Sequence, residues 1–214
     1  MCGRHDKKEG FSITFYKCLY KNQRIARCNS LIYNFTNYFV TDETTFNLSH
    51  YLCNVLSLKM ILTMKPYDVN LIADYIILRL NSDESVNLIN LKLQKLLYYL
   101  QAWSLGINKE PFVNCSFEAW VHGPVSRELY DRFKTSRSLY SFITVSDVIH
   151  KNPETMIESD DIEFINYILD NYAGYSGAEL ESMTHKEDPW MEARNGYAPM
   201  QSCNKTISEE TMRV

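Results

Sequence analysis

The sequence NLKLQKLLYYLQAW at residues 90–103, followed by FEAWVHGPVSRELYDRF at residues 117–133, decides the fold of this chain. In the first block Asn90 can cap a helix whose leucines recur at spacings of three and four, and Gly106 offers a left-handed stop. Because its apolar residues cover a wide arc, this helix is predicted to lie at the centre of the domain. The second block has a specific pattern but no recognisable catalytic set. This combination favours a binding protein.

Other segments carry the same helical signals of cap, period and stop. Apolar residues at helical spacing predict a helix from position 69 to Leu80, and acidic residues in a first turn predict another that begins at Ser159. A shorter helix is expected at residues 177–184. The residues expected to open these helices and a last one near the C-terminus are Asp68, Ser159, Ser176 and Ser208.

The connector between the central helix, which is expected to end near Gly106, and the helix expected at residues 125–133 has little helical character. Residues 117–121 are expected to be extended or irregular, and Gly123 with Pro124 breaks any continuous helix. Pro124 suits a turn or the first turn of a helix at residues 125–133. Residues 140–149 hold enough β-branched and aromatic residues for a short strand, but a packed loop fits equally well. The fold class is therefore mainly α: a compact multi-helix single domain with at most a short strand or hairpin.

Length and charge narrow the range of functions. The chain has 214 residues, of which 45% are hydrophobic and 22% charged, so it can bury a sizeable core. Residues 1–63 hold eight Lys and Arg against four Asp and Glu, a balance of +4, whereas residues 64–214 hold fourteen against twenty-two, a balance of −8. An acidic body argues against nucleic-acid binding, which requires clustered cations, and suits a basic protein partner.

The composition changes near Met64. Residues 1–63 are poorly patterned, and two interpretations remain open: an N-terminal extension, or translated upstream sequence with the natural start at Met60 or Met64. The expected division is an extension at 1–63 and one domain at 64–214. Neither a signal peptide nor a long apolar run is evident, so a cytoplasmic location without membrane contact is expected. The six cysteines contain no Cys-x-x-Cys, which signals neither zinc nor a disulfide framework.

The blocks, in their order, resemble the Panacea domain, also called the SocA-like antitoxin or GepA phage-associated family. The resemblance covers roughly residues 64–214. The motifs that carry it are LQKLLYY at 93–99 with AW at 102–103, FEAWVHGP at 117–124 with LY at 129–130, Leu180, TH at 184–185, EDPW at 187–190, AR at 193–194 and IS at 207–208.

The resemblance implies a bacterial or prophage antitoxin that neutralises a cognate toxin through protein contact. The toxin is expected to be the product of a neighbouring gene. A role as an adaptor that delivers the toxin to a cytosolic protease is a further expectation of the resemblance. No cofactor is implied.

The motif residues are the candidates for partner binding, although several have a simpler structural explanation. Trp103 is predicted to pack in the core, whereas for Trp120 and Trp190 core packing and partner contact both remain open. Gln94 is expected to satisfy backbone groups of the connector at 120–124. The full candidate set is Gln94, Lys95, Trp120, His122, Gly123, Pro124, Tyr130, His185, Asp188, Trp190 and Arg194. The residues interpreted as ordinary surface charges are Arg127, Glu128, Asp131 and Arg132.

Two other functions compete with the antitoxin hypothesis. A metal-dependent hydrolase would use His122, His185 and a nearby carboxylate, which must converge within bonding distance. A DNA-binding autoregulator would need a basic recognition helix, and the mixed charges of residues 125–133 fit that role poorly. Neither a nucleophile elbow nor a glycine-rich phosphate loop is present in the sequence.

Overall fold

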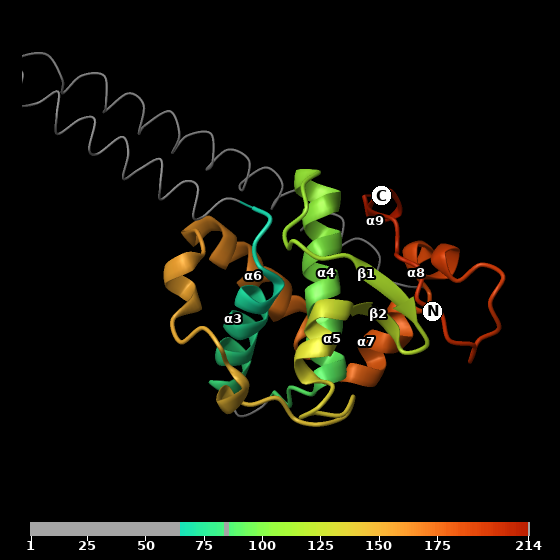
Figure 1. Ribbon diagram of the computed structural model, residues 1–214. Coiled ribbons are helices and arrows are strands. Elements are labelled where there is room, and N and C mark those ends of the chain that lie inside the picture. The colour runs from blue at the N-terminus through green and yellow to red at the C-terminus, as the bar shows by residue number, and fades with distance from the viewer. Residues whose placement is uncertain (1–64, 84–85, 214) are drawn as a thin grey trace, which may run out of the picture. The chain divides into compact units, whose positions relative to one another are not determined.

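The fold comes from a computed structural model that describes residues 65–83 and 86–213, all of which belong to one compact unit, Thr63–Val214. The predicted extension at residues 1–63 lies outside the described residues. The described part is mainly α, as predicted, and its sheet has two strands (Figure 1). The elements are α3 (Val69–Asn81), α4 (Asn90–Asn108), β1 (Phe117–Trp120), β2 (Gly123–Ser126), α5 (Arg127–Phe133), α6 (Ser159–Tyr172), α7 (Gly177–Thr184), α8 (Asp188–Ala193) and α9 (Glu209–Met212).

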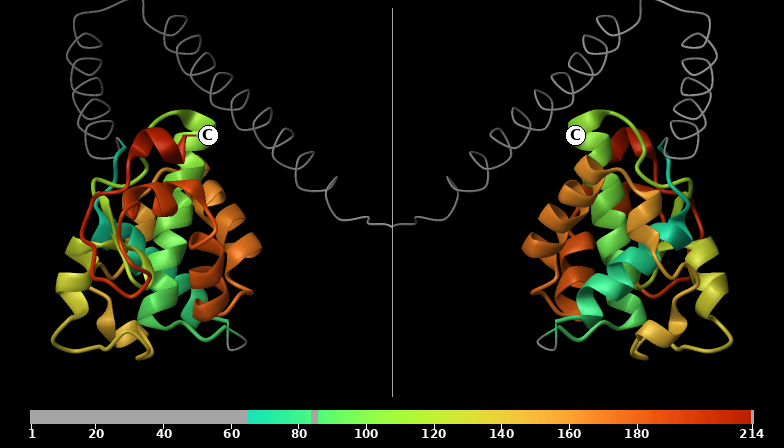
Figure 2. Two further views of the ribbon diagram at one scale, coloured as in Figure 1. Left: turned by 90° about the vertical axis from the view of Figure 1, so that its right-hand side faces the viewer. Right: turned by 90° about the vertical axis from the view of Figure 1, so that its left-hand side faces the viewer.

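Helix α4 is the axis of this unit, as its apolar arc predicted. It packs against α3, α6, α7, α9 and β2, which surround it (Figures 1 and 2). Its residues 90–101 are all buried, including polar ones. In the described residues, no helix is long and apolar enough to cross a membrane.

The predicted caps of α4 are wrong at both ends. Asn90 is the first helical residue, and Ile89 at the N-cap makes no side-chain cap. The first-turn amides are satisfied instead by a distant segment, since the N–H groups of Asn90 and Leu91 donate to the carbonyl oxygens of Ser141 and Leu139. At the other end Gly106 lies within the helix, and Lys109 adopts the left-handed conformation with φ +61°.

The buried polar side chains of α4 bond to the segments around it. Lys92 Nζ donates to the carbonyl oxygen of Ala173 at the end of α6, at 2.6 Å. Gln101 Oε1 accepts from the amides of Phe112 and Val113, at 2.8 and 2.9 Å. Trp103 is only half-buried, contrary to the prediction of a core position, and its indole N–H donates to the Tyr172 hydroxyl at 2.9 Å.

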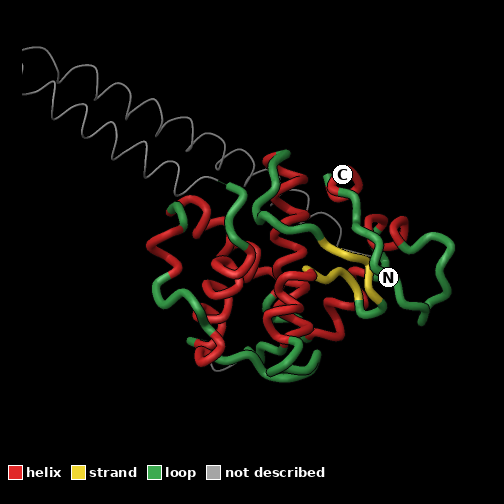
Figure 3. Tube along the Cα trace, viewed as in Figure 1, coloured by secondary structure: helices red, strands yellow, loops and turns green. Residues whose placement is uncertain are grey.

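Strands β1 and β2 form an antiparallel hairpin, coloured yellow in Figure 3. Trp120 pairs with Gly123, so the turn consists of two residues, and Gly123 adopts φ +89°. The predicted helix 125–133 is shorter than expected: Pro124 lies in β2, and Ser126 caps α5 by accepting from the Leu129 amide. The backbone of residues 205–207 bonds to the outer edge of β1 through the Ala119 amide and the Phe117 carbonyl.

Residues 140–149 form a packed loop rather than a strand. Phe142 makes one isolated bridge with Ile89, and Val145–Asp147 is a 3-10 turn. Helix α7 has its predicted bounds, with a capping box between Ser176 and Glu179. Helix α6 begins at Ser159 as predicted, with Glu158 at its N-cap.

Candidate partner-binding surface

The inner side of the hairpin rests on two buried polar side chains of α4. Gln94 Oε1 accepts from the Ser126 amide at 2.9 Å, and Lys95 Nζ donates to the carbonyl oxygen of Pro124 at 3.1 Å. Gln94 therefore satisfies backbone of the hairpin as predicted, two residues beyond the expected connector. Neither side chain lies on a solvated face of the helix, because Gln94 is 3% exposed and Lys95 is 0% exposed.

Lys95 lies directly beneath the hairpin turn. A Cβ built at Gly123 would stand 2.7 Å from Lys95 Cε and 2.8 Å from Thr184 Oγ1, so the turn, α4 and α7 meet here. Burial lowers the pKa of Lys95 to about 7, although the nearby Glu181 carboxylate opposes the shift. The Lys95 amine can donate its bond to Pro124 in either protonation state.

Residues 184–194 hold the other strand of the hairpin, β1. The Trp190 indole N–H donates to the Trp120 carbonyl at 3.0 Å, and Arg194 Nη1 donates to the Ala119 carbonyl at 2.9 Å. The His185 ring stacks on Trp190 with centroids 4.0 Å apart. Trp120 lies on β1, in agreement with the extended alternative for residues 117–121, and Trp190 lies on α8.

Glu187 connects this block to the central helix. Its carboxylate accepts from the hydroxyls of Tyr98 and Tyr99, at 3.3 and 2.8 Å. Burial raises the pKa of the Glu187 carboxyl, and the two tyrosine bonds oppose that shift. The start of α8 is therefore tied to α4 through one half-buried acid.

The outer side of the hairpin opens into a cleft of about 410 Å³. Trp120 is half-buried in its wall, with the Arg127 guanidinium 4.7 Å above its ring and the Tyr130 ring at 4.7 Å. The Glu118 carboxylate holds Trp120 and Arg127 together, because it accepts from the Trp120 indole N–H at 2.7 Å and from Arg127 Nη2 at 2.8 Å. The lining residues are Trp120, Val121, His122, Arg127, Ser202, Cys203 and Asn204.

His122 stands at the tip of the hairpin, between the cleft and the neighbouring loop. Its Nδ1 lies 3.0 Å from the Glu181 carboxylate, and the side chain is 45% exposed. Its ring contacts that of Tyr140, with centroids 6.5 Å apart. Burial lowers the pKa of His185, which lies within electrostatic range of His122.

The candidate residues from the sequence thus fall into two groups. The buried group supports the hairpin: Gln94, Lys95, Gly123, Pro124 and Arg194. The group with solvent access comprises Trp120, His122, Tyr130, His185, Asp188 and Trp190. A direct role of either group in partner binding stays a prediction. The lining residues Ser202, Cys203 and Asn204 were missed, because a loop of small polar residues gives no periodic signal.

The described residues contain no group of three His, Cys, Asp or Glu side chains placed to hold a metal ion. His122 is paired with Glu181, whereas His185 stacks on Trp190. No ligand set for the hydrolase hypothesis is therefore visible in the described part of the chain.

Comparison with known proteins finds a match to one family model. The family model described as antitoxin SocA-like, Panacea domain matches residues 93–191, from α4 to α8. No curated protein and no solved structure matches the chain.

Proposed function

From the premise that residues 93–191 form a SocA-like Panacea domain, we propose that this protein is an antitoxin that binds and neutralises a cognate toxin protein. The family match carries this proposal. In this role the chain acts by contact and is not an enzyme. Its partner is the product of a neighbouring gene, and the complex forms in the cytoplasm.

The hairpin cleft is the part of the surface that best suits this contact. Tryptophan, tyrosine and arginine are the residue types that dominate binding hot spots. Trp120 and Arg127 line this cleft, and the Tyr130 ring packs against Trp120. Because α4 and residues 184–194 fix the hairpin from both sides, little side-chain and backbone freedom remains to be lost on binding. The cleft is thus a pre-organised site for a protruding segment of a partner.

Co-expression with the neighbouring gene product tests the proposal. Wild type should restore growth in cells that produce the toxin and should co-purify with it. Trp120→Ala should weaken binding at least tenfold, as expected for loss of a hot-spot tryptophan, whereas Tyr175→Ala, at an exposed aromatic outside the cleft, should bind as wild type. A neighbouring product that is harmless alone and does not bind would refute the proposal.

Blocking and protease delivery both begin with this complex, and the fate of the toxin separates them. With an adaptor, the toxin should disappear faster after inhibition of protein synthesis when the antitoxin is present. With simple blocking, toxin and antitoxin should persist together. Immunoblots over a time course, in cells with and without the cytosolic protease, measure the difference.

A further inference from the structure

The loop at residues 140–149 exposes an unusual amount of apolar surface. Four of its large side chains face solvent, with relative exposures of 58–62%; we call them the apolar ridge, and they are Tyr140, Phe142, Val145 and Ile149. Single exposed apolar residues are ordinary, but this loop carries four of the eight large hydrophobic side chains that are exposed in the described residues, which makes it a candidate interaction surface.

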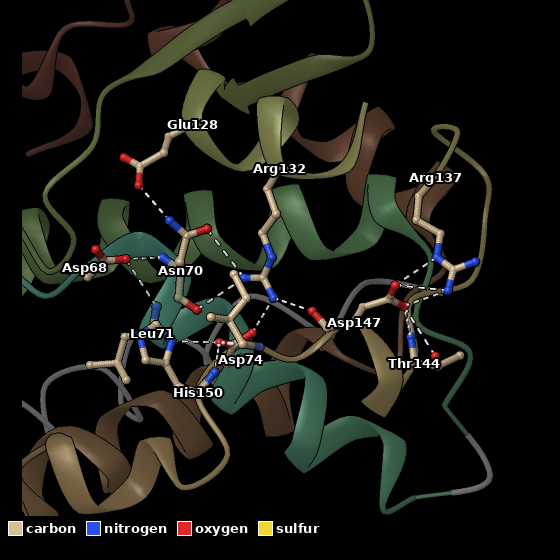
Figure 4. A network of polar contacts seen from close by, with 11 residues as sticks. Asp68, Asn70, Leu71, Asp74, Glu128, Arg132, Arg137, Thr144, Asp147 and His150 are labelled. Atoms are coloured by element: carbon tan, nitrogen blue, oxygen red, sulfur yellow. Dashed lines mark hydrogen bonds and ion pairs between the residues drawn. The ribbon is translucent and has the colours of Figure 1, made fainter. Parts of the chain in front are cut away.

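The ridge is held from below by a network of charges, shown in Figure 4. Asp74 on α3 is completely buried, and its carboxylate contacts Arg132 Nη2 of α5 at 2.5 Å. The same carboxylate accepts from the amides of Ile149 and His150, at 3.1 and 2.8 Å. Arg132 Nη2 also donates to the Asp147 carbonyl at 2.6 Å, so both helices fix the loop backbone.

A second ion pair fixes the middle of the loop. Arg137 donates through Nε and Nη2 to the two carboxylate oxygens of Asp147, both at 3.1 Å. Asp147 in turn accepts from the Thr144 amide at 2.8 Å. These bonds lower the pKa of the Asp147 carboxyl, although its partial burial opposes the shift. The backbone between Thr144 and His150 is therefore held on both sides of Val145.

This arrangement keeps the loop surface apolar and ordered. Burying a charge is unfavourable unless it is paired, and here Asp74 is placed where it satisfies loop amides that would otherwise bond to water. Three cations near the loop, Arg132, Lys134 and Arg137, each pair with an aspartate, whereas Lys151, just after the loop, is exposed. An ordered apolar surface loses little conformational entropy when a partner covers it.

The ridge also continues from the hairpin cleft. The Tyr140 ring contacts that of His122, and His122 lines the cleft. Residues 64–214 carry a net charge of −8, fourteen Lys and Arg against twenty-two Asp and Glu, which attracts a basic protein. One partner can therefore reach the cleft and the ridge at once.

We propose that the apolar ridge inserts into an apolar groove, rimmed by basic residues, on the same toxin that occupies the hairpin cleft. The inference rests on the proposed antitoxin function and adds a second contact of defined chemistry to it. The cleft receives a segment of the toxin, whereas the ridge enters the toxin.

The test is a binding titration of the purified toxin with full-length antitoxin variants. The double variant Phe142→Gln and Ile149→Gln should weaken binding at least thirtyfold, because two large apolar contacts are lost. Tyr175→Gln is the matched control, an exposed aromatic outside the ridge, and should change affinity less than twofold. Thermal unfolding of each variant checks the fold, and both changed side chains are exposed, so the midpoints should stay near that of wild type.

The outcomes separate this inference from the proposed function. If Trp120→Ala loses binding and the double variant binds as wild type, the antitoxin function stands and the ridge contact is refuted. If wild type does not bind the toxin, both fail. If light scattering shows a wild-type dimer that the double variant converts to a monomer, the ridge joins two copies of this chain, which also overturns the proposal.

Discussion

Gly123 turns the hairpin in a left-handed conformation, directly against Lys95 and Thr184. Gly123→Ala should lower the free energy of unfolding by about 2–4 kcal/mol, because both the positive φ and the 2.7 Å contact with Lys95 Cε oppose a Cβ. Gly106→Ala is the matched control: it lies within α4 with open space around it, and should stabilise the protein by about 0.5–1 kcal/mol. Urea unfolding of both variants measures the contrast. Equal effects would show that Gly123 is not sterically confined.

Arg132 was interpreted as an ordinary surface charge, but its side chain is only 10% exposed and lies against the buried Asp74 carboxylate. Arg132→Met should lower the free energy of unfolding by about 3–5 kcal/mol, since it leaves that carboxylate buried without its strongest partner. Arg127→Met, on the same helix but 46% exposed, should lower it by less than about 1 kcal/mol. Chemical denaturation measures both. A small effect at Arg132 would contradict a structural role for the ion pair beneath the loop.

At the scale of elements, buried polar side chains of α4 bond to the segments packed around it. One of them, Lys95, makes a contribution to stability that depends on pH. Its pKa of about 7 in the folded protein lies below its ordinary value of 10.5, so between these limits the unfolded chain binds more protons. The contribution of Lys95 to stability therefore rises as the pH rises from 7 toward 10.

The comparison of wild type with Lys95→Met isolates this contribution. The wild-type free energy of unfolding, minus that of the variant, should increase with pH between 7 and 10, with a slope of at most about 1.4 kcal/mol per pH unit. Methionine does not titrate, so groups elsewhere cancel in the difference. Urea titrations at several pH values supply the data. A difference that stays flat over this range would mean that Lys95 is not desolvated in the folded state.

The sequence predicts these elements well where spacing alone determines them. The periodic apolar residues of α3, α6 and α7 locate those helices. As expected, Asp68 caps α3 and Ser176 caps α7. The start of α4 could not be predicted in detail, because its first amides bond to the carbonyl groups of a loop some 50 residues later in the chain. Tertiary contacts of this kind leave no local trace in the sequence.

The candidate site shows the same division. The motif signals single out Gln94, Trp120 and Trp190, and the structure places all three at or beneath the hairpin. In contrast, the burial of Arg132 depends on α3 packing beside α5 with a loop across both, as Figure 4 shows. Charge pattern within one helix cannot reveal a partner on another.

At the scale of the whole molecule, the balance of −8 over residues 64–214 should govern how fast a basic partner arrives. The association rate constant with the toxin should fall on the order of tenfold between 50 and 500 mM salt, because salt screens long-range attraction. The dissociation rate should change much less, since apolar contacts hold the bound state. Stopped-flow measurements at several salt concentrations test this, and an association rate independent of salt would exclude electrostatic steering.

The backbone of residues 205–207 bonds to the outer edge of β1, and side chains of α4 bond to backbone groups of β2. The hairpin consequently has no unoccupied row of amide and carbonyl groups beside Phe117 or Ala119 at which another chain could add a strand. Recognition at this sheet must be read from side chains rather than from main-chain pairing. A change of partner can therefore follow from a few surface substitutions while the backbone of the hairpin stays as it is.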